Sequence, residues 1–159
     1  MKRTIVERSV FVVVSCVALA AALFLNSLRV PVMRLPAEVE AMVGQEASVA
    51  FTAFFTDFQE WYNDHPVTDE GVQLTKENDY QALGDMLMGM NAYWEACAQL
   101  DGEIADQMQV FNQPILIVFM LTLNMMMPLE TADSFVIAAE EWEAIGGYVN
   151  DVITAYQAQ

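Results

Sequence analysis

The chain has 159 residues and a formal net charge of −16 at pH 7, and 55% of its residues are hydrophobic. This length is enough for one folded domain with a short appendage, and the hydrophobic fraction exceeds the ~45–50% usual for soluble domains. Every Lys and Arg except Lys76 lies in residues 1–34, and every Asp and Glu except Glu7 lies after residue 37. So acidic a domain repels nucleic acid and anionic lipid headgroups, which argues against a nucleic-acid partner.

The amino-terminal region has the pattern of a membrane anchor. Residues 1–9 form a basic tail, and residues 10–28 (VFVVVSCVALAAALFLNSL) contain no charged side chain. A helix of this length spans about 28 Å, close to the thickness of the bilayer core. We therefore predict a transmembrane anchor at residues 10–28. The alternative is a cleaved signal peptide with Ala18-Leu19-Ala20 as its small-residue site, although the sequence stays apolar for several residues beyond that site.

Basic residues on the two sides of this segment predict its orientation. Lys2, Arg3 and Arg8 precede it, whereas Arg29 and Arg34 follow it. Together with the amino group, the balance favours an amino terminus in the cytoplasm. We therefore predict a single-pass membrane protein with an extracytoplasmic main domain, which would be periplasmic in a bacterium.

Two further regions follow the anchor. Residues 29–36 (RVPVMRLP) are predicted to form a proline-containing neck, and residues 37–159 an acidic helical domain. The acidity of this domain is consistent with a solvated surface in a high-salt habitat, with a docking face for a basic protein partner, or with weak binding of divalent cations.

Four helices are predicted within the acidic domain, at about residues 37–62, 77–100 and 103–127 and from beyond Pro128 nearly to the end. Pro114 is expected to kink or restart the third helix. In the second and fourth helices, apolar residues recur at alternating steps of three and four, as in a packed helix bundle. These residues are Leu83, Leu87, Met90, Trp94 and Cys97, and then Phe135, Ala138, Trp142, Ile145, Val149, Val152 and Tyr156. Without any alternating strand pattern, we predict an all-α domain, a four-helix up-and-down bundle.

The first predicted helix carries an aromatic stripe between Phe51 and Tyr62. Such a stripe most often belongs to a core or a subunit interface. A pocket for a flat cofactor or another small ligand is the alternative.

Residues 114–128 (PILIVFMLTLNMMMP) are apolar in nearly every direction around a helix. A second membrane span would have to extend over residues 111–129 and include several polar residues, so it is disfavoured. A bundle buries only about one stripe of each helix, and soluble monomers avoid large exposed apolar patches. Partner subunits, a second copy of the chain or the membrane surface should therefore cover the remainder. The predicted partner-binding residues are Phe111, Ile115, Ile117, Phe119, Met120 and Leu123, together with Phe51, Phe55 and Trp61.

Methionines suggest an alternative function, because thioethers favour Cu(I). Met86 and Met90 share one helical face, and Met125 and Met127 lie within the run 125–127. A copper site would require the second and third helices to bring these four side chains together, since neither run converges on one ion by itself.

No pattern of catalytic residues is present. His65 is the only histidine and lies in an acidic loop, where a solvated side chain is usual. Cys97 is most simply a small buried hydrophobic residue, and the acidic cluster at residues 140–143 is dispersed around its helix. We predict no catalytic residue and no cofactor. The sequence favours a non-catalytic accessory or assembly subunit of a membrane protein complex.

Overall fold

The computed structural model describes residues 33–157, and this part of the chain is mostly helical, as predicted. The predicted tail and anchor lie outside the described residues, as does most of the predicted neck. The end of that neck belongs to the domain instead, because Met33 and Leu35 are buried in the hydrophobic core.

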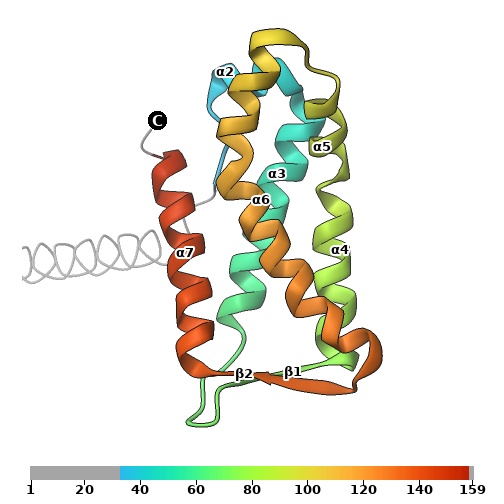
Figure 1. Cartoon of the computed structure of the whole chain (residues 1–159), viewed down its shortest axis with the longest axis vertical. Coiled ribbons are helices and arrows are strands. Elements are labelled where there is room, and N and C mark those ends of the chain that lie inside the picture. Colours follow the sequence, from blue (N-terminus) through green and yellow to red (C-terminus); the bar gives the residue numbers. More distant parts are fainter. Residues whose placement is uncertain (1–32, 158–159) are drawn as a thin grey trace, which may run out of the picture. The chain divides into compact units, whose positions relative to one another are not determined.

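The helices and strands are, in chain order, α2 (Ala37–Val43), α3 (Gln45–Asn63), β1 (Val72–Thr75), the π-helical turn η1 (Lys76–Tyr80), α4 (Gln81–Gly89), α5 (Asn91–Ala98), α6 (Gly102–Thr131), β2 (Ser134–Ile137) and α7 (Ala139–Gln157). Figure 1 shows α3 running toward the end that carries the strands, α4 and α5 leading back, α6 returning and α7 leading away again. α4 and α5 run in the same direction, and this pair is antiparallel to α3 and to α6, as α6 is to α7.

The two strands correct the expectation of a domain without strands. β1 and β2 pair antiparallel, with Val72 opposite Ile137 and Thr75 opposite Ser134. Val72 and Leu74 face the core while Gln73 is exposed, so β1 has the alternation of a half-buried strand within only four residues. Gly71 precedes β1 with φ 109°, and a Cβ at this position would lie 2.1 Å from the carbonyl oxygen of Ile137. The strand pair therefore requires glycine there.

Helix ends differ from the prediction in three places. The first predicted helix is divided at Gly44, whose φ is 88°, and the second is divided at Met90. α6, by contrast, continues through both Pro114 and Pro128, so the third predicted helix does not restart at Pro114.

Hydrogen bonds from α7 support α6 beside its first proline. A proline inside a helix removes one backbone hydrogen bond and disturbs the carbonyls of the preceding turn. The hydroxyl of Tyr156 donates to the carbonyl of Phe111, and that of Tyr148 donates to the carbonyl of Pro114 at 3.5 Å. These bonds join α7 to the turn of α6 that contains Pro114, and neither of them reaches the carbonyl of Val110, which lacks its usual donor because Pro114 has no amide hydrogen.

The core lies between α3 and the helices around it. Phe51, Phe54, Phe55 and Phe58 of α3 are buried, and the rings of Phe54 and Phe55 meet edge-on at 5.2 Å. From α7, the predicted series from Trp142 to Tyr156 is buried as expected. Its first two members are not part of that helix, since Phe135 lies in β2 and Ala138 is exposed between the strand and α7.

Candidate interaction surface

α6 has two apolar faces, and only one of them is covered by the rest of the described chain. Its buried residues recur at steps of three, four or seven: Met108, Ile115, Val118, Thr122, Met125 and Leu129. On the opposite side, five large apolar side chains are exposed, by between 44% for Met120 and 70% for Val110. These five residues, which we call the outer face of α6, are Val110, Leu116, Ile117, Met120 and Met127.

The outer face follows the spacing of a helix that packs against another helix. Exposed residues recur along it at alternating steps of three and four: Val110, Gln113, Ile117, Met120, Asn124 and Met127. This is the repeat that places one side of a helix against a partner helix along its whole length. α6 therefore exposes a second line of residues with helix-packing spacing, in addition to the one that its own domain covers.

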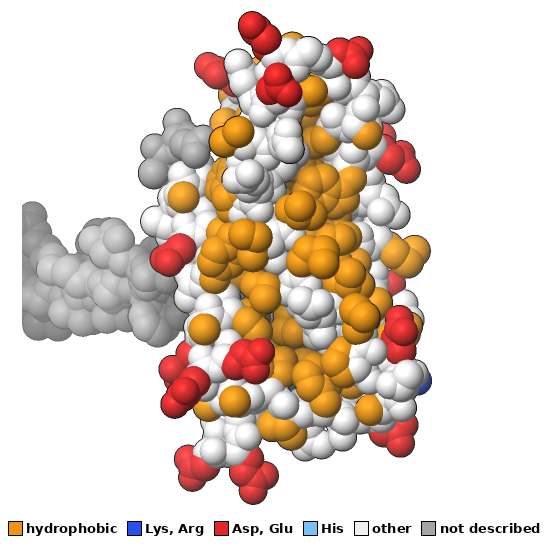
Figure 2. Space-filling model, in the orientation of Figure 1, with side chains coloured by type: hydrophobic (Ala, Val, Ile, Leu, Met, Phe, Trp, Pro, Cys, Tyr) orange, Lys and Arg blue, Asp and Glu red, His pale blue; other side chains and the backbone are white. Residues whose placement is uncertain are grey.

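Charged side chains are absent from the middle of this surface and lie around its edges. No charged residue lies between Asp106 and Glu130 in α6. In the view of Figure 1, where α6 lies in front, Figure 2 shows hydrophobic side chains over the centre and acidic side chains mainly toward both ends and the edges. An apolar centre with a charged rim is the anatomy of a protein interface.

Length and apolar composition also make α6 the one helix within residues 33–157 that could cross a membrane. The same properties are found in core helices of soluble proteins, and this helix lies in the middle of the chain. Half-buried residues beside its buried face contact α3, α4 and α5. A Cβ on Gly84 of α4 would lie 3.7 Å from the sulfur of Met126, and Phe119 contacts Phe54 of α3 and Trp94 of α5.

The predicted partner-binding residues fall into three groups. Ile117 and Met120 belong to the outer face. Phe111, Phe119 and Leu123 are half-buried at its margins. The other four are core residues that no partner reaches in this fold, which corrects the prediction that they contribute to the contact surface: Ile115, Phe51, Phe55 and Trp61. Their side chains point inward because α3 has its apolar residues on one face, and Ile115 lies on the inner face of α6.

Three members of the outer face were not individually named as partner-binding residues, although Leu116 and Met127 lie within the apolar segment at about residues 111–127 that was predicted to bind partners. Val110 precedes the apolar run, Leu116 lies beside Ile117, and Met127 was considered as a copper ligand. The signal that identifies Val110 and Met127 is the continuation of the three-and-four repeat beyond Ile117 and Met120. Choosing this repeat over the inner one requires knowledge of which side faces α3 and α4.

The four candidate copper ligands do not share one environment. Met86, Met90 and Met125 are buried in the core, whereas Met127 is 53% exposed on the outer face of α6. In the part of the chain that is described, no group of three or more His, Cys, Asp and Glu side chains is placed to hold a metal ion.

His65 belongs to a buried polar cluster, which corrects the expectation of a solvated loop side chain. Its Nε2 lies 2.9 Å from Oδ1 of Asp79, and its Nδ1 lies 2.7 Å from the carbonyl oxygen of Trp61. Asp79 also accepts hydrogen bonds from the indole of Trp61 at 3.0 Å and from the amide of Thr75 at 2.6 Å. Because a carbonyl can only accept, His65 donates from Nδ1 to Trp61. The cluster fastens the loop after α3 to η1.

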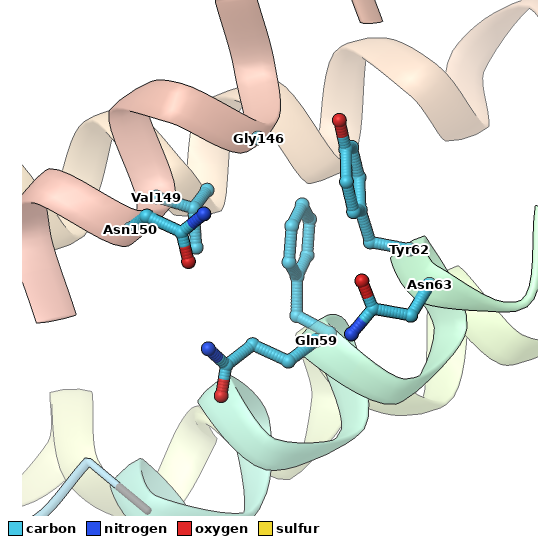
Figure 3. A pocket seen from close by; sticks show the side chains of 7 residues that line it. Gln59, Tyr62, Asn63, Gly146, Val149 and Asn150 are labelled. Atoms are coloured by element: carbon cyan, nitrogen blue, oxygen red, sulfur yellow. The ribbon is translucent and has the colours of Figure 1, made fainter. Parts of the chain in front are cut away.

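A small polar pocket lies between α3 and α7. It is lined by Phe58, Gln59, Tyr62, Asn63, Gly146, Val149 and Asn150, and its volume is about 40 Å³. Figure 3 shows the side-chain amides of Gln59, Asn63 and Asn150 around it. This volume fits a few water molecules, and it is much smaller than the flat-cofactor pocket considered for the aromatic stripe. Tyr62 instead stacks on Trp142, with ring centroids 4.6 Å apart.

Comparison with protein-family models found no matching family, and comparisons with curated proteins and with solved structures found no match. The function must therefore be argued from the residues of this chain and their arrangement.

Proposed function

We propose that this protein is a non-catalytic accessory or assembly subunit of a membrane protein complex. Residues 10–28 anchor it in the membrane as a single span, with the amino terminus in the cytoplasm. The described helices form an acidic up-and-down bundle outside the cytoplasm. Partner subunits bind to the outer face of α6.

The observation that carries this proposal is the exposure of one whole side of α6. Full burial of a large aliphatic side chain contributes about 1.5–3 kcal/mol, so each half-exposed side chain of the outer face offers roughly 1 kcal/mol to a partner. Exposing several such side chains along one line is unfavourable for a soluble monomer, because contiguous apolar surface promotes association. A partner that covers the line removes this cost.

The anchor and the outer face serve the same purpose in this proposal. A membrane span confines the domain to the surface on which membrane complexes assemble. Confinement raises the effective concentration of the domain near its partner, so a contact of modest area is enough for stable association.

Affinity purification from native membranes tests the proposal. The full-length protein, with a carboxy-terminal tag, is extracted in mild detergent, and the proteins that accompany it are identified by mass spectrometry. We expect stoichiometric partners with the wild-type chain and their loss with Ile117→Glu or Met120→Glu, because each places a charge in the apolar contact.

Val136→Glu is the matched control, since Val136 is 54% exposed on β2 and does not belong to the outer face. This variant should retain the partners. Recovery of a partner-free wild-type monomer would contradict the proposal. So would retention of the same partners by both α6 variants.

A further inference from the structure

We propose, building on the proposed function, that the segment which covers the outer face of α6 is an amphipathic α-helix with an apolar stripe flanked by Lys and Arg. The spacing of the outer face argues for a helix, and the acidic residues around it argue for basic flanks.

Spacing gives the geometry of the partner. The repeat from Val110 to Met127 runs at alternating steps of three and four along α6, and it matches the side of a second helix packed along it. At 1.5 Å per residue this repeat is roughly 26 Å long, which corresponds to about five turns of a partner helix. An extended strand repeats every two residues and does not follow this line.

Asn124 adds a polar position to the same line. It is exposed and occupies the place of a packing residue between Met120 and Met127. Gln113 is the other polar position of the repeat. Polar residues within an apolar helix contact fix the alignment of the two helices, because their amides need hydrogen-bonding partners once they are covered. We therefore expect a polar side chain opposite Asn124 in the partner.

Charge distinguishes the possible occupants. Asp106 lies one turn before Val110, and Glu130 lies one turn after Met127, so exposed acids bracket the repeat on the same side of α6. Among the described residues, Arg34 and Lys76 are the only Lys or Arg, and the only ion pair is that of Asp79 with His65. Neither Asp106 nor Glu130 forms a salt bridge among these residues, and the ammonium of Lys76 lies near Glu130, where it donates to the backbone carbonyl at 2.9 Å.

A second copy of this chain would meet like charges in either orientation. An antiparallel pair of α6 helices places Asp106 near Glu130 of the other copy, and a parallel pair places each acid near itself. Like charges across an interface oppose association, and an anionic lipid surface is repelled for the same reason. Basic flanks, in contrast, would be attracted to both ends of the repeat.

The test uses the full-length protein in nanodiscs of zwitterionic phosphatidylcholine and two synthetic helical peptides. Both carry Leu at the positions of the apolar stripe; one has Lys at the flanking positions and the other has Glu. Binding is measured by fluorescence anisotropy, with empty nanodiscs as the blank. We expect the Lys peptide to bind at least about tenfold more tightly than the Glu peptide, a difference of roughly 1.4 kcal/mol.

Variants assign this binding to the outer face and its rim. Ile117→Gln and Met120→Gln should each weaken binding of the Lys peptide about tenfold, and Val136→Gln should leave it unchanged. The double change of Asp106→Asn and Glu130→Gln should remove most of the preference for Lys. Raising the salt concentration should do the same, because screening shortens the reach of charge from about 10 Å at 0.1 M to about 3 Å at 1 M.

The outcomes separate this inference from the proposed function. If Lys and Glu peptides bind equally, or neither binds, while purification still yields partners that Ile117→Glu removes, the basic-helix inference is wrong and the proposed function stands. If the wild-type protein is instead a dimer by light scattering and Ile117→Gln makes it a monomer, the occupant is a second copy. If peptide binding and partner recovery are both unaffected by the α6 variants, both proposals fail.

Discussion

α3 and α6 are both rich in large apolar side chains, yet they have different relationships to the rest of the domain. In α3 the aromatic side chains lie on one face, and all of its phenylalanines are buried, while Val49 is exposed. In α6 large apolar side chains lie on all sides, so packing against α3 and α4 uses half of them and leaves the outer face exposed. A one-sided apolar helix can be satisfied within its own domain. A helix that is apolar on most sides leaves apolar side chains exposed in the same domain.

The largest expected effect on stability lies in α3. Phe55→Ala should lower the free energy of unfolding by about 3–5 kcal/mol, because Phe55 is fully buried among other aromatic rings. Urea unfolding of the full-length protein in detergent, followed by tryptophan fluorescence, measures this change. A loss below about 1 kcal/mol would contradict the assignment of the α3 stripe to the core.

Asp79→Asn tests how the end of α3 is fixed. The substitution removes the charge opposite His65 and turns one acceptor oxygen into a donor within a buried cluster that needs acceptors. We expect a loss of about 2–4 kcal/mol in the same unfolding experiment. Asp85→Asn is the control, because Asp85 is exposed on α4 and its change should stay within about 0.5 kcal/mol. Equal effects of the two substitutions would refute the role of the cluster.

Two adjacent glycines test the contact between α3 and α7. A Cβ on Gly146 would lie 2.3 Å from the hydroxyl oxygen of Tyr62, whereas Gly147 has open space around it. Gly146→Ala should destabilise the protein by about 1–3 kcal/mol through overpacking. Gly147→Ala should be neutral or stabilise it by up to about 1 kcal/mol, because alanine favours a helix. Thermal unfolding distinguishes the two, and an unchanged melting temperature for Gly146→Ala would show that the helices lie farther apart.

Alkaline pH should weaken the contact between α7 and α6. Burial raises the pKa of Tyr156 from 10.0 to about 12. The unfolded chain then loses this proton at lower pH than the folded chain. The contribution of Tyr156 to the free energy of unfolding is therefore fully present below pH 10.0 and is lost between pH 10.0 and about 12. Tyr156→Phe should make the free energy of unfolding less dependent on pH in this range. An identical pH profile in the variant would contradict the buried position of the hydroxyl.

The smallest effect on stability should accompany the largest effect on association. Ile117→Gln replaces a 48% exposed side chain of the outer face, so the unfolding free energy should change by no more than about 0.5 kcal/mol. Partner recovery from native membranes should nevertheless be lost. A destabilisation comparable to that of Phe55→Ala would mean that the outer face is packed inside the domain.

Sequence periodicity predicted which segments are helical more accurately than it predicted where each helix begins and ends. The series from Trp142 to Tyr156 is long enough for the three-and-four repeat to determine which side is buried. The pairing of β1 with β2 joins segments about sixty residues apart, and four residues per strand are too few for a local pattern to be distinctive. α6 is continuous through Pro114, although the missing amide hydrogen of a proline argues for a helix end there when the sequence is considered alone.

Part of the candidate site could be predicted from the sequence, and the rest depends on contacts between distant segments. The excess of apolar residues in α6 and the absence of charge between Asp106 and Glu130 are visible in the chain itself. Which side is free depends on the packing of α3 and α4, so Ile115 was placed on the surface and Val110 was overlooked. His65 was misjudged because its partner Asp79 lies in another segment.

Methionine oxidation in native membranes that have not been exposed to detergent tests the central claim most directly. Met120 and Met127 on the outer face of α6 have exposed fractions similar to that of Met42 on α2, at 44%, 53% and 40%. Mild peroxide treatment followed by mass spectrometry compares their rates of sulfoxide formation. A covered outer face predicts that Met120 and Met127 are protected relative to Met42, and that Ile117→Glu abolishes this protection. Equal oxidation of all three methionines in the wild-type protein would show that nothing covers α6.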